Sequence, residues 1–158
     1  MIQRRPWRCS VVLGSLAVFA VAGCAGMEPP KMSAADAIAQ RQRFMKLNGA
    51  LWSDAKAKAK AGQFEAIAVD AEAMAFNAPM IPSLFPEGSL SDKSAAKPEI
   101  WQKWPEFEAA AKNFQAQAEK LRDVARSKDA NATQAAMRDF GKMACGTCHT
   151  PFRVPPKS

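Results

Sequence analysis

An apolar repeat of seven residues runs through the second half of the chain and constrains its fold more than any other feature. Its two positions are occupied by Phe107, Phe114 and Leu121, and by Ala111, Ala118 and Ala125. Residues at this spacing share one face of a helix, and that face is buried only when other helices pack against it. The repeat therefore predicts a long helix over about residues 99–127 within a helical bundle.

Further amphipathic helices are predicted on either side of this one. Ser33 is a plausible N-cap for a first helix that ends near Gly62. A second helix covers about residues 64–77, and the last begins at Ser127 or Asp129. No segment alternates apolar and polar residues long enough to indicate a strand. The expected fold is all-α, an antiparallel four-helix bundle.

The bundle is expected to occupy residues 33–158, with a proline-rich connection over residues 78–98 between its second and third helices. The N-terminal segment has a different character. A basic start precedes an apolar stretch over residues 11–22, which is too short for a stable membrane anchor. Residues 1–23 are therefore interpreted as a signal peptide and residues 24–32 as a tether.

The predicted signal peptide ends in Val21-Ala22-Gly23-Cys24, which resembles the bacterial lipobox. This resemblance implies cleavage before Cys24, lipidation of Cys24 and a protein in the periplasm that is held at the outer membrane. The alternative is an ordinary secretory signal that is cleaved near Ala25 or Gly26. In both cases the mature protein is expected outside the bacterial cytoplasm.

The charge of the chain argues against nucleic acid as a partner. Three arginines leave with the signal peptide, which lowers the formal charge of +7 by three. The small positive net charge that remains suits a basic docking face for an acidic redox protein better than it suits nucleic-acid binding, for which no motif is present. No enzymatic activity is expected, because the chain offers no nucleophile, no acid–base pair and no histidine beyond His149.

One motif carries chemistry, the run Cys145-Gly-Thr-Cys148-His149. Two thiols at this spacing suit covalent attachment to the vinyl groups of one haem c, with the adjacent histidine facing the iron. A zinc site would need more ligands than this chain offers, and a thioredoxin-like pair would follow a strand. A structural disulfide between Cys145 and Cys148 is possible but would leave His149 unexplained.

The chain resembles the class II c-type cytochromes, the cytochrome c prime family, which carry this motif near the C-terminus of a four-helix bundle. Three segments carry the resemblance: Cys145-Gly-Thr-Cys-His149-Thr-Pro-Phe-Arg153, Asp36-Ala-Ile-Ala-Gln-Arg41-Gln-Arg-Phe-Met45 and Ile100-Trp101-Gln-Lys-Trp104-Pro-Glu-Phe107. Phe152 departs from the tyrosine of many members. The resemblance also implies that the protein can form antiparallel homodimers through its first two helices.

The resemblance assigns His149 as the proximal iron ligand and places Met45 on the distal side. A thioether is a soft ligand that suits haem iron and raises its reduction potential. The alternative is that Met45 fills the core, as Met74, Met137 and Met143 are expected to do. If Met45 does not bind, the iron is five-coordinate, as in many members of the family.

Two arginines are further candidates for the haem site. Arg41 lies one helical turn before Met45 on an otherwise apolar face, and a buried guanidinium needs a partner. That partner is either a haem propionate or an acidic residue on a neighbouring helix. Arg153 follows the motif closely and either screens His149 or a propionate, or lies exposed at the surface.

The leading functional hypothesis is one-electron transfer in the periplasm, with His149 and Met45 as axial ligands and periplasmic or membrane-bound redox proteins as partners. The alternative is a protein that binds nitric oxide or carbon monoxide at a five-coordinate haem. A remote third hypothesis is a helical structural lipoprotein in which the motif is incidental.

Overall fold

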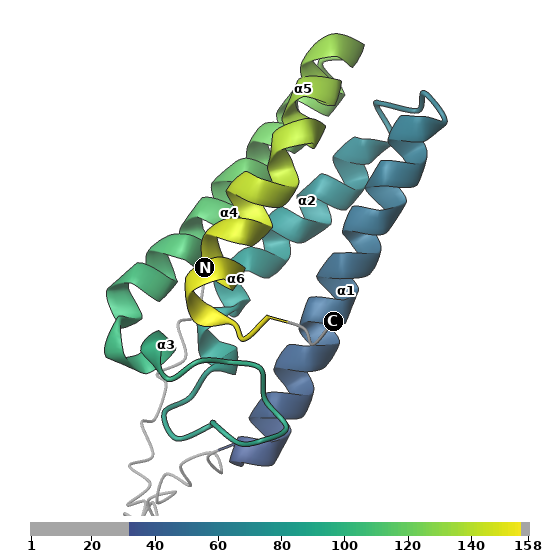
Figure 1. The fold of residues 1–158 in the computed structure, drawn as a ribbon. Helices are drawn as coiled ribbons and strands as arrows, with labels where there is room; N and C mark the ends of the chain where they lie inside the picture. The colour runs from purple at the N-terminus through teal and green to yellow at the C-terminus, as the bar shows by residue number, and fades with distance from the viewer. Residues whose placement is uncertain (1–31, 156–158) are drawn as a thin grey trace, which may run out of the picture. The chain divides into compact units, whose positions relative to one another are not determined.

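The computed structural model describes residues 32–155, which contain four long helical segments lying side by side (Figure 1). The predicted signal peptide, Cys24 and the tether up to residue 31 lie outside the described residues. The all-α four-helix bundle is confirmed. Within the described residues, no helix is both long and apolar enough to cross a lipid bilayer.

The first segment is α1, Ala34–Lys60, and its ends are set by local sequence. The Ser33 hydroxyl accepts a hydrogen bond from the backbone N–H of Asp36 at 3.1 Å, as the predicted N-cap requires. After the helix, Gly62 takes a positive φ of 72°. The N–H of Gln63 then bonds to the carbonyl of Lys58, which satisfies a carbonyl that the helix leaves free.

The second segment is α2, Ile67–Asn77, and it ends where the sequence predicts, before Pro79. The connection that follows is more ordered than the sequence suggests. It contains the short 3-10 helices η1, Ala78–Met80, and η2, Pro82–Leu84, each with proline near its start. Proline fixes φ at a helical value and needs no partner for an N–H there. Residues 85–98 then form the loop at the lower end of Figure 1.

The third segment is interrupted, whereas the sequence analysis predicts one helix. A single turn, α3, Glu99–Gln102, precedes α4, Trp104–Arg126, and Lys103 between them has a non-helical φ of −126°. Pro105 explains the break, because its ring lacks an N–H and would clash with the carbonyl of Trp101 in a continuous helix. The register of α4 is unaffected, and both positions of the seven-residue repeat are buried.

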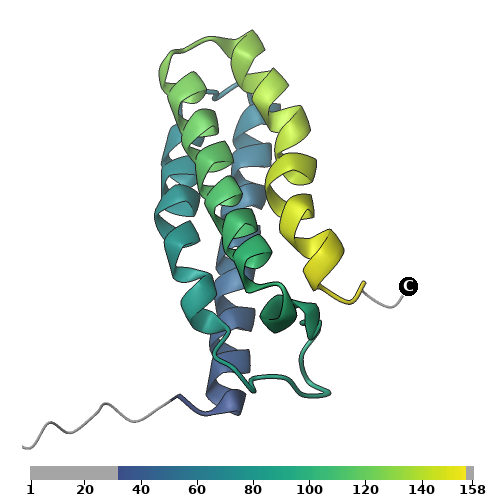
Figure 2. The ribbon, with the colours of Figure 1, turned by 90° about the vertical axis from the view of Figure 1, so that its left-hand side faces the viewer.

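The core lies along α4, which packs against α2 on one side and α5 on the other (Figure 2). Its largest fully buried side chains include Phe107, Leu121, Met74 and Phe140. Met74 therefore fills the core as predicted. The same prediction is wrong for Met143, whose side chain is 46% exposed.

The fourth segment comprises α5, Ala130–Phe140, the π-helix η3, Gly141–Gly146, and α6, Thr147–Phe152. Of the two predicted caps, Asp129 is the one used, since its side chain accepts a hydrogen bond from the N–H of Ala132 at 2.9 Å. The π-helical stretch is not predicted by the sequence analysis. It lies directly before and within the cysteine motif.

Candidate functional site

A cavity of about 490 Å³ opens beside α6, in the size range of small-molecule sites. A second cavity of about 120 Å³ extends toward the core. Met45, Gly49, Ile81, Cys148 and His149 line both. The two hollows are thus neighbouring parts of one site, enclosed mainly by α1, α4, α6 and the loop over residues 85–98.

The π-helix η3 places the motif at this site. Its hydrogen bonds span five residues instead of four, so the helical faces shift in register where it occurs. Phe140 and Ala144 stay in the core, while Cys145, Cys148 and His149 line the cavities. Gly141 and Gly146 bound this stretch. A thiol pair and an imidazole are thereby presented to one apolar space from a single helical segment.

Both cysteines are half-buried, and they do not form the disulfide considered above. Burial raises the pKa of the Cys145 thiol. It raises the pKa of Cys148 to about 11, to which the charge of the neighbouring Cys145 also contributes. At neutral pH both groups are therefore protonated, and neither has the exposed, low-pKa character of a redox-active thiol. Two thiols at an apolar cavity fit covalent attachment of haem c.

His149 reaches the same space from α6. The residue is exposed as a whole, but partial burial of its imidazole lowers the pKa, and the positive charge of Arg153 lowers it further. The side chain is therefore neutral at pH 7, which leaves a ring nitrogen free to bind a metal.

Helix α1 supplies the opposite wall at intervals of one turn. Arg41, Met45 and Gly49 succeed one another at four-residue spacing, and all three line the larger cavity. Met45 is half-buried and also packs against the core. A Cβ placed on Gly49 would meet nothing within 4 Å, so the space beside Met45 is open.

Arg41 is 4% exposed and bonds to the loop, not to an acid. Its guanidinium donates to the Ser89 hydroxyl at 2.9 Å, to the Ser89 carbonyl at 2.7 Å and to the Ser94 hydroxyl. It also lies over the Phe85 ring, 4.9 Å from its centroid. The predicted acidic partner on a neighbouring helix is therefore not found among residues 32–155, where neutral oxygen atoms from the loop accept these bonds.

Arg153 lies exposed at the mouth of the larger cavity. Its backbone is held in an isolated antiparallel bridge with Ala96. The N–H of Val154 bonds to the Ala95 carbonyl at 2.8 Å, and the N–H of Lys97 to the Phe152 carbonyl at 3.0 Å. These bonds join the loop to the end of α6. The charged residues lining the cavity are all basic, namely Arg41, Lys46 and Arg153.

The family model described as Cytochrome C' matches residues 36–153. The chain belongs to the cytochrome c' family. Members of this family carry one covalently attached haem c and are periplasmic in bacteria, and the present chain carries haem c as well. The apolar cavity, the thiol pair of Cys145 and Cys148, and the basic groups at its mouth all fit that cofactor.

Individual relatives agree with the family assignment. Cytochrome c-556 from Agrobacterium fabrum is 33% identical over 135 residues, which cover 83% of this chain and 87% of that protein. Cytochrome c-554 from Cereibacter sphaeroides is 39% identical over 75 residues. This second match covers 46% of the chain and about half of the relative's length, 48%.

Solved structures of cytochromes c' share the fold. One, described as having an unusual ligand-controlled dimer dissociation, is 27% identical with a TM-score of 0.70, covering 78% of this chain and 98% of its own. The cytochrome c prime of Alcaligenes xylosoxidans, as variants with nitric oxide or carbon monoxide bound, is 25% identical with a TM-score of 0.67. It covers the same shares of the two chains.

The structure adds site residues that the sequence analysis did not identify. Gly49 is one of them. Glycine weakens a helix, so a glycine inside α1, one turn after Met45, indicates a position where a side chain would occupy needed space. Phe85, Ser89 and Ser94 are others. They lie in an irregular loop, where no periodicity indicates which side chains turn inward.

Proposed function

We propose that this cytochrome c' family member transfers single electrons, with His149 and Met45 binding the haem iron from opposite sides. One observation supports this function above all: Met45 on α1 and His149 on α6 line the same two cavities. A thioether and an imidazole are the ligand pair that suits an electron carrier, because neither has to leave when the charge of the metal changes. Haem c supplies the one-electron chemistry when bound.

The other residues of the site then have supporting roles. Arg41 uses three N–H groups on Ser89 and Ser94, and a guanidinium has five, so two remain for a propionate. Arg153 provides a second positive charge at the cavity mouth. Ile81, Phe107 and Phe152 make the lining beside these ligands apolar.

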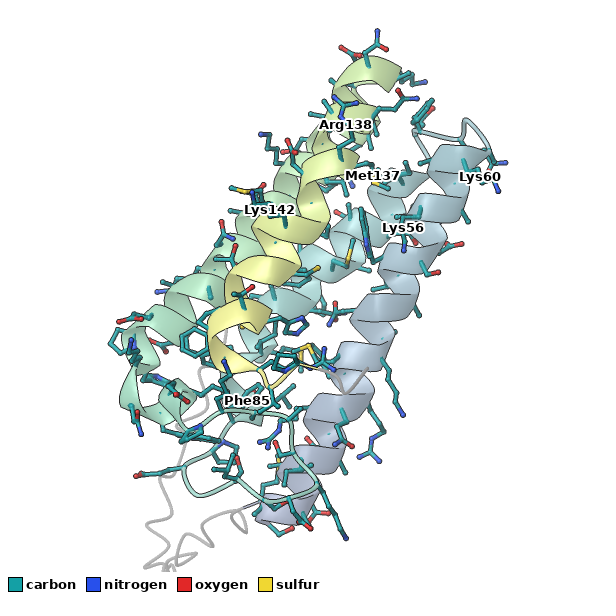
Figure 3. All side chains as sticks on the ribbon, in the orientation of Figure 1. Lys56, Lys60, Phe85, Met137, Arg138 and Lys142 are labelled. Carbon is teal, nitrogen blue, oxygen red and sulfur yellow. The ribbon has the colours of Figure 1, made fainter. Side chains whose placement is uncertain are left out.

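A basic face suits an acidic redox partner. Lys56 and Lys60 on α1 lie across from Arg138 and Lys142 on the fourth segment (Figure 3). None of the four has a carboxylate within 4.0 Å among residues 32–155. Unpaired charges of one sign steer a partner of the opposite sign. Lipidation of Cys24 would keep this encounter at a membrane surface.

Binding of nitric oxide or carbon monoxide is the second candidate. The comparisons support it more directly than electron transfer, because the Alcaligenes xylosoxidans relatives were solved with these gases bound. In this case Met45 only fills space, and the open volume beside Gly49 admits a diatomic ligand. Neither candidate is a catalytic function, and we propose none.

The absorption spectrum of the haem-loaded protein in both oxidation states separates the two. A low-spin spectrum with a methionine-to-iron charge-transfer band supports electron transfer if Met45→Ala removes the band. The control is Met143→Ala, which removes an exposed methionine and should leave the band unchanged. A high-spin ferric spectrum that Met45→Ala does not alter supports gas binding, and a protein without covalent haem refutes both.

We also propose a homodimer, since one solved relative is named for ligand-controlled dissociation of its dimer. On α2, Val69 and Phe76 are 69% and 78% exposed and lie two turns apart, so they offer an apolar contact. Sedimentation velocity should show a dimer that Phe76→Glu converts to a monomer. A native protein that sediments as a monomer at all concentrations contradicts the proposal.

A further inference from the structure

An open groove of about 420 Å³ lies next to the haem cavity and shares the buried Phe85 with it. Its wall consists of three aromatic side chains, two prolines, one hydroxyl and one carboxylate, namely Phe85, Trp101, Trp104, Pro82, Pro86, Ser83 and Glu87. The haem-binding residues take no part in it. Only Phe85 borders both spaces.

The aromatic rings of the groove are held in place. The indole N–H of Trp101 donates to the Phe85 carbonyl at 3.1 Å, so this polar group is already satisfied. Trp104 packs on Phe107, with ring centroids 5.5 Å apart. Both tryptophans are only half-buried. Both consequently present ring surface to the groove, and the indole N–H of Trp101 is not available there as a donor.

Glu87 is the only ionisable residue of the wall, and its position is fixed by a tight turn. The N–H of Ser89 bonds to the Pro86 carbonyl at 3.1 Å, and Gly88 has a φ of 76°, as a type II turn requires. The same Ser89 is bound by Arg41. The exposed carboxylate of Glu87 thus stands at the tip of an anchored turn, without an ion pair among the described residues.

The charge of this wall is the reverse of that of the haem cavity. Aromatic faces carry negative electrostatic potential, and Glu87 adds a full negative charge. Lys103, which adjoins Trp104 in sequence, has its ammonium 4.0 Å from the Glu106 carboxylate. The Phe85 ring already accepts one cation, the Arg41 guanidinium, 4.9 Å from its centroid. The groove is therefore suited to positive charge, whereas the lining of the haem cavity is basic.

We propose that this groove binds an organic cation of the quaternary-ammonium class. Aromatic faces attract such cations within about 6 Å of the ring centroid, and the apolar methyl groups lose little hydration on contact with tryptophan and proline. A metal ion is a poorer candidate, because a hard cation needs about six oxygen ligands and this wall offers one carboxylate and one hydroxyl.

The test is a calorimetric titration of the haem-loaded protein with choline. A dissociation constant on the order of 1 mM is expected for so open a site. The matched control ligand is the neutral isostere of choline in which carbon replaces nitrogen, and it should bind at least about fivefold more weakly. Equal binding of the two overturns the proposal, because the groove would then recognise only apolar surface.

Variants locate the binding. Glu87→Gln should weaken choline binding about fivefold, and Trp104→Leu should abolish it. Asp92→Asn is the matched control, since this exposed carboxylate lies in the same loop as Glu87 but not in the wall, and it should change nothing. Trp104 packs on Phe107, so the Glu87 variant provides the test if Trp104→Leu misfolds. Unchanged binding in Glu87→Gln overturns the proposal.

Glycerophosphocholine distinguishes the source of the cation. It carries the same quaternary ammonium group as choline together with the phosphate of a lipid headgroup. Tighter binding of choline supports a free cation, because Glu87 repels the phosphate. Equal or tighter binding of glycerophosphocholine supports a headgroup at a membrane surface. Failure of all these ligands to bind overturns the proposal and leaves the proposed haem function untouched.

Discussion

Replacing Arg41 with alanine should loosen the wall that the loop over residues 85–98 provides for the haem cavity. The guanidinium makes three hydrogen bonds to Ser89 and Ser94, although these residues lie 48 and 53 positions away in sequence. Burial lowers the pKa of Arg41, but a guanidinium stays charged at any ordinary pH. It therefore acts as a permanent charged link between α1 and the loop.

The cost of the Arg41→Ala substitution follows from what each partner retains. The Ser89 hydroxyl still donates to the Pro86 carbonyl, and the Ser94 hydroxyl still accepts from the N–H of Ala96. The Ser89 carbonyl has no such substitute, and an unsatisfied buried acceptor costs about 1–3 kcal/mol. Loss of the contact with Phe85 adds about 0.5–1 kcal/mol. Together these terms predict a loss of about 1.5–4 kcal/mol.

Guanidinium chloride unfolding, followed by far-ultraviolet circular dichroism, measures this loss. Arg43→Ala is the matched control, because Arg43 is an exposed arginine on the same helix and its removal should cost less than about 0.5 kcal/mol. Hydrogen exchange should also accelerate at the amides of residues 87–96. If Arg41→Ala costs no more than Arg43→Ala, the hydrogen bonds of Arg41 do not stabilise the loop, and the reasoning is wrong.

Three further predictions concern single residues. The Asp54 and Asp70 carboxylates raise the pKa of Lys58. The ion pairs of Lys58 therefore stabilise the protein fully below pH 10.5, and this stabilisation declines as the pH rises through the raised pKa. The free energy of unfolding should fall at alkaline pH in the native protein and in the control Lys60→Met, but not in Lys58→Met. Asp129→Ala should lower the free energy of unfolding by about 1 kcal/mol, because it removes the bond that caps α5, and a value near zero contradicts this role. Gly49→Ala should raise the free energy of unfolding by about 0.5–1 kcal/mol and keep its haem. Gly49→Leu should lower the haem content, measured as pyridine haemochrome. Normal haem content in the leucine variant contradicts the role of Gly49 in leaving space.

The features that the sequence predicts correctly depend on neighbours along the chain. The buried face of α4 follows from a repeat of seven residues, and the start of α1 follows from the side chain of Ser33. Arg41 and Met45 are correctly placed on one face because they lie one turn apart. In each case a periodicity or a cap within a few residues determines the outcome, so no knowledge of the tertiary structure is needed.

The features that the sequence does not predict depend on contacts between distant segments. The partners of Arg41 come from an irregular loop, so an acid and a serine were equally compatible with the sequence. The π-helix before Cys145 is a change of one residue in register, and only its bounding glycines hint at it. The break at Lys103 is different, because it has a local signal: Pro105 favours the first turn of a helix, where α4 begins.

The two functions proposed for the haem site are opposite ends of one equilibrium at Met45. A gas binds only to molecules in which the thioether is away from the metal, so the apparent affinity is the intrinsic affinity multiplied by the fraction of such molecules. If Met45 is bound in all but about 1% of molecules, Met45→Ala should bind carbon monoxide about a hundredfold more tightly than the native protein. Titration of the reduced proteins with carbon monoxide measures this ratio, and Met143→Ala controls for loss of a methionine elsewhere. A ratio near one means that Met45 does not occupy the sixth position, and electron transfer through a methionine-bound haem is then refuted in favour of gas binding.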